Sequence, residues 1–149
     1  MKQLLIVRHS KSDNNDPSLK DFDRSLNERG HKNAQEMAKR LVTQDIIPQK
    51  IVSSPALRAL TTANYFADKF GIERSAIIKN ERIYEASANT LLKIVTGFNE
   101  GADFIGFFGH NPGLSELAFQ LSNNAGLGSL PTTGMALIEF PFDKWSMVS

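Results

Sequence analysis

Apolar residues along this chain alternate between short continuous runs and longer stretches with helical spacing. The runs predict strands at residues 2–7, 50–54, 103–110 and 135–142, and a weaker one at 76–80. The helical spacing predicts amphipathic helices at 25–44, 56–71, 88–99 and 112–122. Gly71 is suited to cap the second helix, and Pro141 indicates that the last strand ends there or lies at an edge.

This order of strands and helices predicts an α/β fold. We expect a single domain over residues 1–149, a three-layer α/β/α sandwich with a mostly parallel central sheet. In such sheets ligands bind at the carboxyl ends of the strands. Arg8-His9, Ser53-Ser54 and Gly109-His110 each follow a predicted strand, so we expect them to converge on one crevice.

Composition narrows the function classes. Lys and Arg number 17 against 16 Asp and Glu, so no overall charge points to nucleic acid or a membrane, and we expect neither as a partner. The absence of cysteine excludes disulfides, thiolate metal sites and cysteine nucleophiles. The apolar run before Arg8 is too short for a signal peptide, and no stretch is long enough to span a membrane. A soluble cytoplasmic protein is the expected class.

Two histidines and two arginines carry the candidate chemistry. The chain has only three histidines, and His9, His110, Arg8 and Arg58 would together form a compact cationic pocket for a dianion. Arginine matches phosphate oxygens with paired hydrogen bonds and neutralises charge that develops during phosphoryl transfer. A neutral imidazole can attack phosphorus, and a second, protonated histidine can donate to the phosphate. We therefore expect neither a metal nor a cofactor at this site.

Three segments resemble the motifs of a known family. LLIVRHSKSD resembles the Arg-His-Gly signature of the histidine phosphatase superfamily, the acid phosphatase and phosphoglycerate mutase clan. IVSSPALRALTTA is similar to that family's second-arginine segment, and FFGHNPG to its second-histidine segment. With DFDRSLNERG and IYEAS, the chain looks most like the short SixA-type phosphohistidine phosphatases. The matches run in order over about three quarters of the chain.

The resemblance implies a phosphoglycerate mutase-like fold and assigns roles to individual residues. It implies that His9 is the nucleophile that becomes phosphorylated, and that Arg8, Arg58 and His110 complete the phosphate pocket. One position departs from the pattern, because Ser10 stands where the family usually has glycine. Its hydroxymethyl group must fit beside the phosphate or point away from it.

Two further residues are weaker candidates for the site. Glu85, in IYEAS, resembles the carboxylate that protonates the leaving alkoxide in relatives that act on phosphate esters. The alternative is a structural carboxylate ahead of the third predicted helix. Asn15 is a candidate phosphate ligand, with Ser12 and Asn14 beside it, although such a polar tract is more often simply a loop.

Other polar residues have structural interpretations. We expect Asp23 to pair with Arg24, Ser25 and Glu28 to form a capping box, and His31 to lie on the surface of a helix. The phenylalanines of the 103–110 strand are expected in the core. DFDRS also fits the motif of aspartate-based phosphatases, but no apolar strand precedes it, so we set that hypothesis aside.

The leading hypothesis for function is a metal-independent phosphatase with a phosphohistidine intermediate, acting on phosphohistidine in a protein such as a phosphorelay or phosphotransferase component. The short intervals between motifs leave little room for a cap that would enclose a small metabolite. An imidazole leaving group also needs less protonation than an alkoxide. Two alternatives stay open: a small-molecule phosphomonoesterase of the same superfamily, and a catalytically silent phosphate-binding module.

Overall fold

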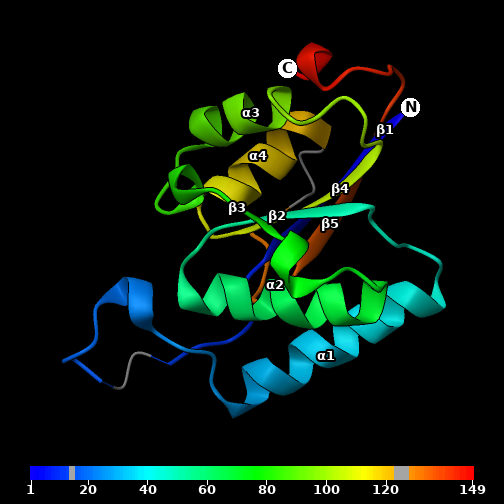
Figure 1. The fold of residues 1–149 in the computed structure, drawn as a ribbon. Coiled ribbons are helices and arrows are strands. Elements are labelled where there is room, and N and C mark those ends of the chain that lie inside the picture. Colours follow the sequence, from blue (N-terminus) through cyan, green and yellow to red (C-terminus); the bar gives the residue numbers. More distant parts are fainter. Residues whose placement is uncertain (14–15, 123–127) are drawn as a thin grey trace.

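A twisted sheet runs through the middle of the molecule (Figure 1). The computed structural model describes residues 1–13, 16–122 and 128–149, and within them five strands pair in the order β3-β2-β4-β1-β5. β1, β2, β3 and β4 are parallel, and β5 lies antiparallel to β1 at one edge. The strands are β1 (Lys2–Arg8), β2 (Lys50–Ser53), β3 (Ile78–Lys79), β4 (Phe104–Gly109) and β5 (Met135–Phe140).

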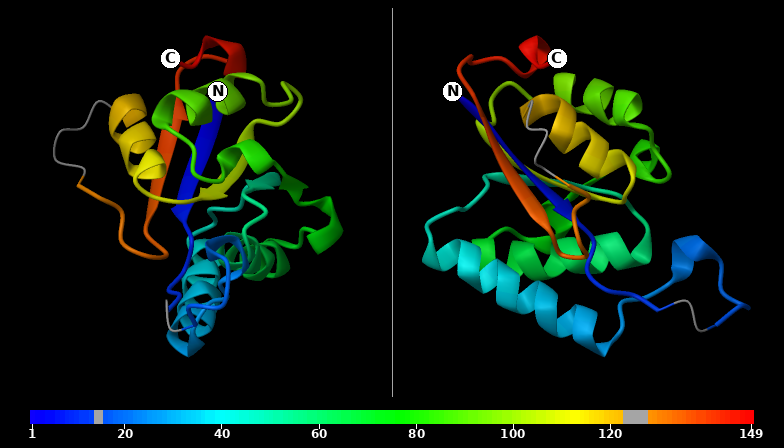
Figure 2. Two further views of the ribbon diagram at one scale, coloured as in Figure 1. Left: turned by 90° about the vertical axis from the view of Figure 1, so that its left-hand side faces the viewer. Right: turned by 180° about the vertical axis from the view of Figure 1, so that it is seen from behind.

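Helices cover both faces of the sheet, which confirms the predicted α/β/α layers (Figure 2). α1 (Glu28–Thr43) and α2 (Leu57–Phe70) pack on one face, and α3 (Ala88–Thr96) and α4 (Gly113–Ser122) on the other. β1 and β4 are buried on both faces because they lie between these layers, which is why their sequences are almost continuously apolar. Phe107 and Phe108 point into the two opposite cores, as strand alternation requires.

Most predicted elements are present with small changes at their ends. The C-cap of α2 is Gly71 in the left-handed conformation, with φ 75°, and β5 stops before Pro141, as predicted. The predicted strand at 76–80 is reduced to the two residues of β3. No helix of the described ranges is long and apolar enough to cross a membrane.

Two predicted local contacts are wrong. The N-cap of α1 is Asn27, whose side chain accepts the Gly30 N–H at 2.7 Å, so Ser25 and Glu28 do not form a capping box. Leu26 is buried and held extended by an isolated bridge to Ser12, so the helix can begin only after it. Arg24 pairs with Asp21 rather than with Asp23.

Candidate active site

The carboxyl ends of neighbouring strands bring the predicted residues together. Arg8 ends β1 and lies opposite Gly109, which ends β4, so the next residues, His9 and His110, are neighbours. Their ring centroids are 5.3 Å apart. Because parallel strands end at the same edge of the sheet, the two motifs meet although about one hundred residues separate them.

His9 is fixed in one neutral tautomer. Its Nδ1 lies 2.6 Å from the carbonyl oxygen of Ser10, and a carbonyl can only accept, so Nδ1 carries the proton. The lone pair of the neutral ring is therefore on Nε2. Burial lowers the pKa of His9 to about 4, and the positive charges of Arg58, Arg8 and Arg24 add to that effect. A neutral imidazole with one free nitrogen is the form that can attack phosphorus.

Arg8 and Arg58 are held by oxygen atoms outside the crevice. Arg8 donates to the Leu130 carbonyl at 3.0 Å, and the carboxyl group and the carbonyl of Asp21 hold both terminal nitrogens of Arg58. Burial, followed by the charge of Arg58, lowers the pKa of Arg8 from its usual value. Within the described residues, Nε of each arginine is buried without a hydrogen-bond partner. These two N–H groups can donate to an incoming anion.

His110 makes a different set of contacts. Its Nε2 lies 2.8 Å from the Ser54 hydroxyl, and its Nδ1 is buried with no partner among the described residues. Burial and, after it, the positive charge of Arg58 lower the pKa of His110 to about 3. His110 is thus neutral at pH 7 by itself. The protonated donor expected from the sequence requires a dianion beside it, because an opposite charge raises an imidazole pKa.

The side chain of Ser10 points away from the site. It is fully buried, its hydroxyl donates to the Gly30 carbonyl at 2.6 Å, and it accepts from the Thr133 hydroxyl at 2.8 Å. The Ser10 backbone N–H donates to the Thr62 hydroxyl at 2.9 Å. The serine therefore replaces the usual glycine without blocking the approach of a phosphate to His9.

Sequence reasoning missed the residue that organises this edge of the site. Asp21, in the short η1 helix (Asp21–Asp23), binds Arg58, Arg24 and the hydroxyl group of Tyr84. These bonds, that of Tyr84 first, lower the pKa of Asp21 to about 2, so it stays ionised. Burial and the bond to Asp21 raise the pKa of Tyr84 to about 12, so its hydroxyl stays a donor. Asp21 and Arg24 are close in sequence, but Arg58 and Tyr84 come from two other segments, so the sequence did not indicate that the four side chains bond together.

Of the two weaker candidates, Glu85 lies within the described residues. Glu85 is exposed and adopts a left-handed backbone conformation, with φ 56°. Among the described residues, no hydrogen bond or ion pair joins its carboxylate to His9 or His110. Its neighbour Tyr84 instead contacts His110, with ring centroids 5.5 Å apart. Asn15 lies outside the described residues.

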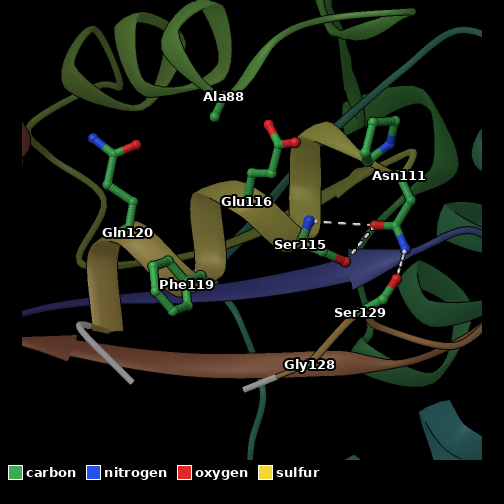
Figure 3. Close-up of a pocket in the computed structure, with 9 residues that line it drawn as sticks. Ala88, Asn111, Ser115, Glu116, Phe119, Gln120, Gly128 and Ser129 are labelled. Atoms are coloured by element: carbon green, nitrogen blue, oxygen red, sulfur yellow. Dashed lines mark hydrogen bonds between the residues drawn. The ribbon is translucent and has the colours of Figure 1, made fainter. Parts of the chain in front are cut away.

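A groove adjoins the site beyond His110 (Figure 3). It has a volume of about 740 Å³ and lies between α3 and α4, with Glu116 and Phe119 on its α4 side. Asn111 connects it to the phosphate pocket, because its amide donates to the same Leu130 carbonyl that holds Arg8. The described lining contains no histidine or arginine, so the candidate chemistry lies in the crevice and not in the groove.

The crevice offers the chemistry of an anion site, because guanidinium groups surround its neutral imidazoles. No group of three histidine, aspartate or glutamate side chains could hold a metal ion within residues 1–13, 16–122 and 128–149. A buried imidazole among guanidinium groups, at the carboxyl end of a parallel sheet, is the arrangement of an α/β protein with an anion site suited to phosphate.

Comparison with known proteins agrees with this class. The family model of the histidine phosphatase superfamily (branch 1) matches residues 4–94, which is more than half of the chain. The chain belongs to the histidine phosphatase superfamily. His110 lies beyond the matched residues, so its place in the site comes from the structure. The search of curated proteins gave no match.

Solved structures share the whole fold. The candidate phosphohistidine phosphatase SixA of Agrobacterium tumefaciens is 27% identical, with a TM-score of 0.83 over 91% of this chain and 90% of the other. A protein histidine phosphatase SixA in complex with tungstate is 22% identical, with a TM-score of 0.79 over 92% and 87%. A mycobacterial glucosyl-3-phosphoglycerate phosphatase is 16% identical, with a TM-score of 0.67 over 91% and 89%. The fold thus occurs in proteins named for different phosphorylated substrates.

Proposed function

We propose that this chain is a metal-independent phosphatase that forms a phosphohistidine intermediate on His9 and removes phosphate from phosphohistidine in a protein. The observation that carries the proposal is the state of His9: its Nδ1 proton is held by the Ser10 carbonyl, so Nε2 faces the reaction as a neutral nucleophile. The similarity to SixA phosphatases and the short intervals between the motifs support a protein substrate.

The reaction has two steps in this proposal. His9 Nε2 attacks phosphorus in line, the substrate P–N bond breaks, and the leaving imidazole keeps the electron pair and takes a proton. Water then attacks phospho-His9, which releases inorganic phosphate and restores the neutral ring. Arg8, Arg58 and His110 bind the phosphate oxygens in both steps, and they stabilise charge that a metal ion would otherwise neutralise. Asn15 remains a proposed phosphate ligand.

The need for a proton donor depends on the substrate. Imidazole leaves with little assistance because its conjugate acid has a pKa of about 6.5, whereas an alkoxide must be protonated as it departs. Glu85 stays the proposed donor for phosphate esters. Its left-handed backbone is the kind of strained conformation that often marks functional residues.

A small-molecule phosphomonoesterase is the second candidate. The similarity to a glucosyl-3-phosphoglycerate phosphatase favours it, although at 16% identity that likeness concerns the fold. A catalytically silent phosphate-binding module is the third. The cytoplasmic location expected from the sequence stays a prediction.

The experiment is steady-state dephosphorylation in EDTA, with a phosphohistidine-bearing protein, p-nitrophenyl phosphate and a panel of sugar phosphates as substrates. We expect wild type to act on the phosphohistidine protein and His9→Ala to lose at least about 10³-fold in rate. His31→Gln is the matched control. It also removes an imidazole, but one that lies on α1 and bonds to Tyr65, outside the crevice. Faster turnover of a sugar phosphate would favour the second candidate. Binding of phosphate without any turnover would replace the enzyme with the binding module.

A further inference from the structure

Four aromatic rings form a row that leads out of the crevice. Successive centroids are 5.3 Å apart from His9 to His110, 5.5 Å from His110 to Tyr84, and 5.2 Å from Tyr84 to Phe22. The His110–Tyr84 and Tyr84–Phe22 pairs meet edge to face. Exposure rises along the row, from 7% at His9 to 37% at Phe22. The row therefore joins the nucleophile to the surface.

The outer rings are held firmly. Phe22 follows Asp21, whose carboxylate binds Arg58 and Arg24 and accepts the hydroxyl of Tyr84. Phe22 keeps 37% of its surface exposed, and it stands on an anchored turn beside the crevice. A fixed aromatic surface costs a ligand little entropy to contact, which is the property of a recognition surface.

Attack at phosphorus defines where the leaving group lies. An in-line displacement places the leaving group opposite His9 Nε2, on the solvent side of the phosphate. The rings of Tyr84 and Phe22 continue from His110 toward the surface, since Phe22 is the most exposed of the row. We propose that Phe22 and Tyr84 form an aromatic wall that receives a flat, aromatic leaving group, namely the imidazole ring of a phosphohistidine. This specificity rests on the proposed phosphatase function.

The charges around the wall fit that leaving group. A phosphohistidine ring that is protonated on its second nitrogen carries a positive charge, and that proton lets the imidazole leave as a neutral ring. A cationic ring is attracted by the faces of Phe22 and Tyr84, and by the ionised carboxylate of Asp21 between them. A sugar hydroxyl has neither a flat face nor a positive charge, so the wall discriminates against it.

The test distinguishes the effect of an aromatic leaving group from the effect of the type of bond that is broken, P–N or P–O. One pair of substrates is a phosphohistidine peptide and a phospholysine peptide, which both contain a P–N bond. The other pair is phenyl phosphate and glycerol phosphate, which both contain a P–O bond. We expect Phe22→Leu to lower kcat/KM about three- to tenfold for the two aromatic members, and less than twofold for the others. The matched control is Phe119→Leu, because Phe119 is also an exposed ring, at 47%, but lies on α4.

A second variant distinguishes the role of the Tyr84 ring from the role of its hydrogen bond to Asp21. Tyr84→Phe keeps the ring but loses the bond to Asp21 that helps to hold Arg58. It should lower kcat/KM for all four substrates alike. If Phe22→Leu affects aromatic and aliphatic substrates equally, or has no effect at all, the proposal that these rings select an aromatic leaving group is wrong.

The two proposals fail in different ways. If wild type cleaves only the phosphate esters, the phosphohistidine substrate is wrong, and the phenyl and glycerol pair still decides whether the wall selects rings. If wild type cleaves none of the four, both proposals are withdrawn.

Discussion

At the scale of the residue, Ser10 shows how this chain departs from the usual motif and keeps its geometry. Glycine would leave the Gly30 carbonyl and the Thr133 hydroxyl without the partner that Ser10 provides. Thr133 has a positive φ of 59°, which is unfavourable for a β-branched residue and needs compensation from its surroundings. Its backbone N–H also donates to the His9 carbonyl at 3.1 Å. Ser10 and Thr133 thus fix the turn whose carbonyl orients His9.

We predict that Ser10→Gly lowers the free energy of unfolding by about 1–3 kcal/mol, because two buried polar groups lose their partner. The rate should fall too, since a looser turn no longer holds the Nδ1 proton of His9. Urea unfolding and kcat on p-nitrophenyl phosphate measure the two effects. In a double-mutant cycle with Thr133→Val, the second substitution should cost less once Ser10 is glycine. Full additivity would mean that the two hydroxyls do not act together.

The motif residues could be predicted from the sequence, but the hydrogen bonds that hold them in place could not. Arg8, His9, Arg58 and His110 stand beside strand ends in recognisable segments, and the structure brings them to one edge of the sheet. The bond from Asp21 to Arg58 spans 37 positions, and no periodicity links the two. The protonation state of His110 could not be predicted from the sequence either, because it depends on burial that only the fold defines.

At the scale of the element, the patterns predicted the kind and order of elements better than their ends. Helix α1 begins three residues later than expected because the Ser12–Leu26 bridge keeps the preceding chain extended. Strand β3 is short because its two residues pair with only Val52 and Ser53 of β2. Both differences arise from pairings between distant segments, which hydrophobic periodicity does not contain.

The contact between α1 and the loop after β1 depends on one glycine. A Cβ on Gly30 would lie 2.0 Å from the Lys11 carbonyl oxygen, and both groups are backbone, so the helix and the loop must separate. We predict that Gly30→Ala lowers the free energy of unfolding by about 3 kcal/mol and reduces activity with it.

Thermal and urea unfolding test this prediction, with Gly97→Ala as the control. A Cβ on Gly97, at the end of α3, would meet its nearest neighbours at an ordinary 3.6 Å. If the two variants are equally stable, the close approach at Gly30 is not a constraint.

At the scale of the whole molecule, the fold stabilises the neutral form of two imidazoles. The usual histidine pKa is 6.5, and the fold lowers it to about 4 in His9 and about 3 in His110. Below pH 6.5 the unfolded chain therefore binds protons that the folded chain does not. The stability present above pH 6.5 is lost as the pH falls toward 4. Asp21, with a pKa of about 2, adds a further loss only at lower pH.

We predict that the free energy of unfolding decreases between pH 6.5 and 4 by about 1.4 kcal/mol per pH unit for each of the two histidines. Urea titrations at half-unit intervals measure this slope. His9→Asn and His110→Asn should each make it shallower, and the double variant should be nearly flat in this range. An unchanged slope in the double variant would assign the pH dependence to other groups.

The chain enters and leaves the sheet at the end opposite the crevice (Figure 2). Met1 pairs with Asp143, the Lys2 ammonium binds the Ala102 carbonyl, and the Trp145 indole donates to that same carbonyl. A fluorophore, an affinity handle or a sensor surface attached near residue 1 or 149 would therefore leave the mouth of the crevice facing solution. Immobilised protein could capture phosphorylated partners in an orientation that the sheet itself imposes.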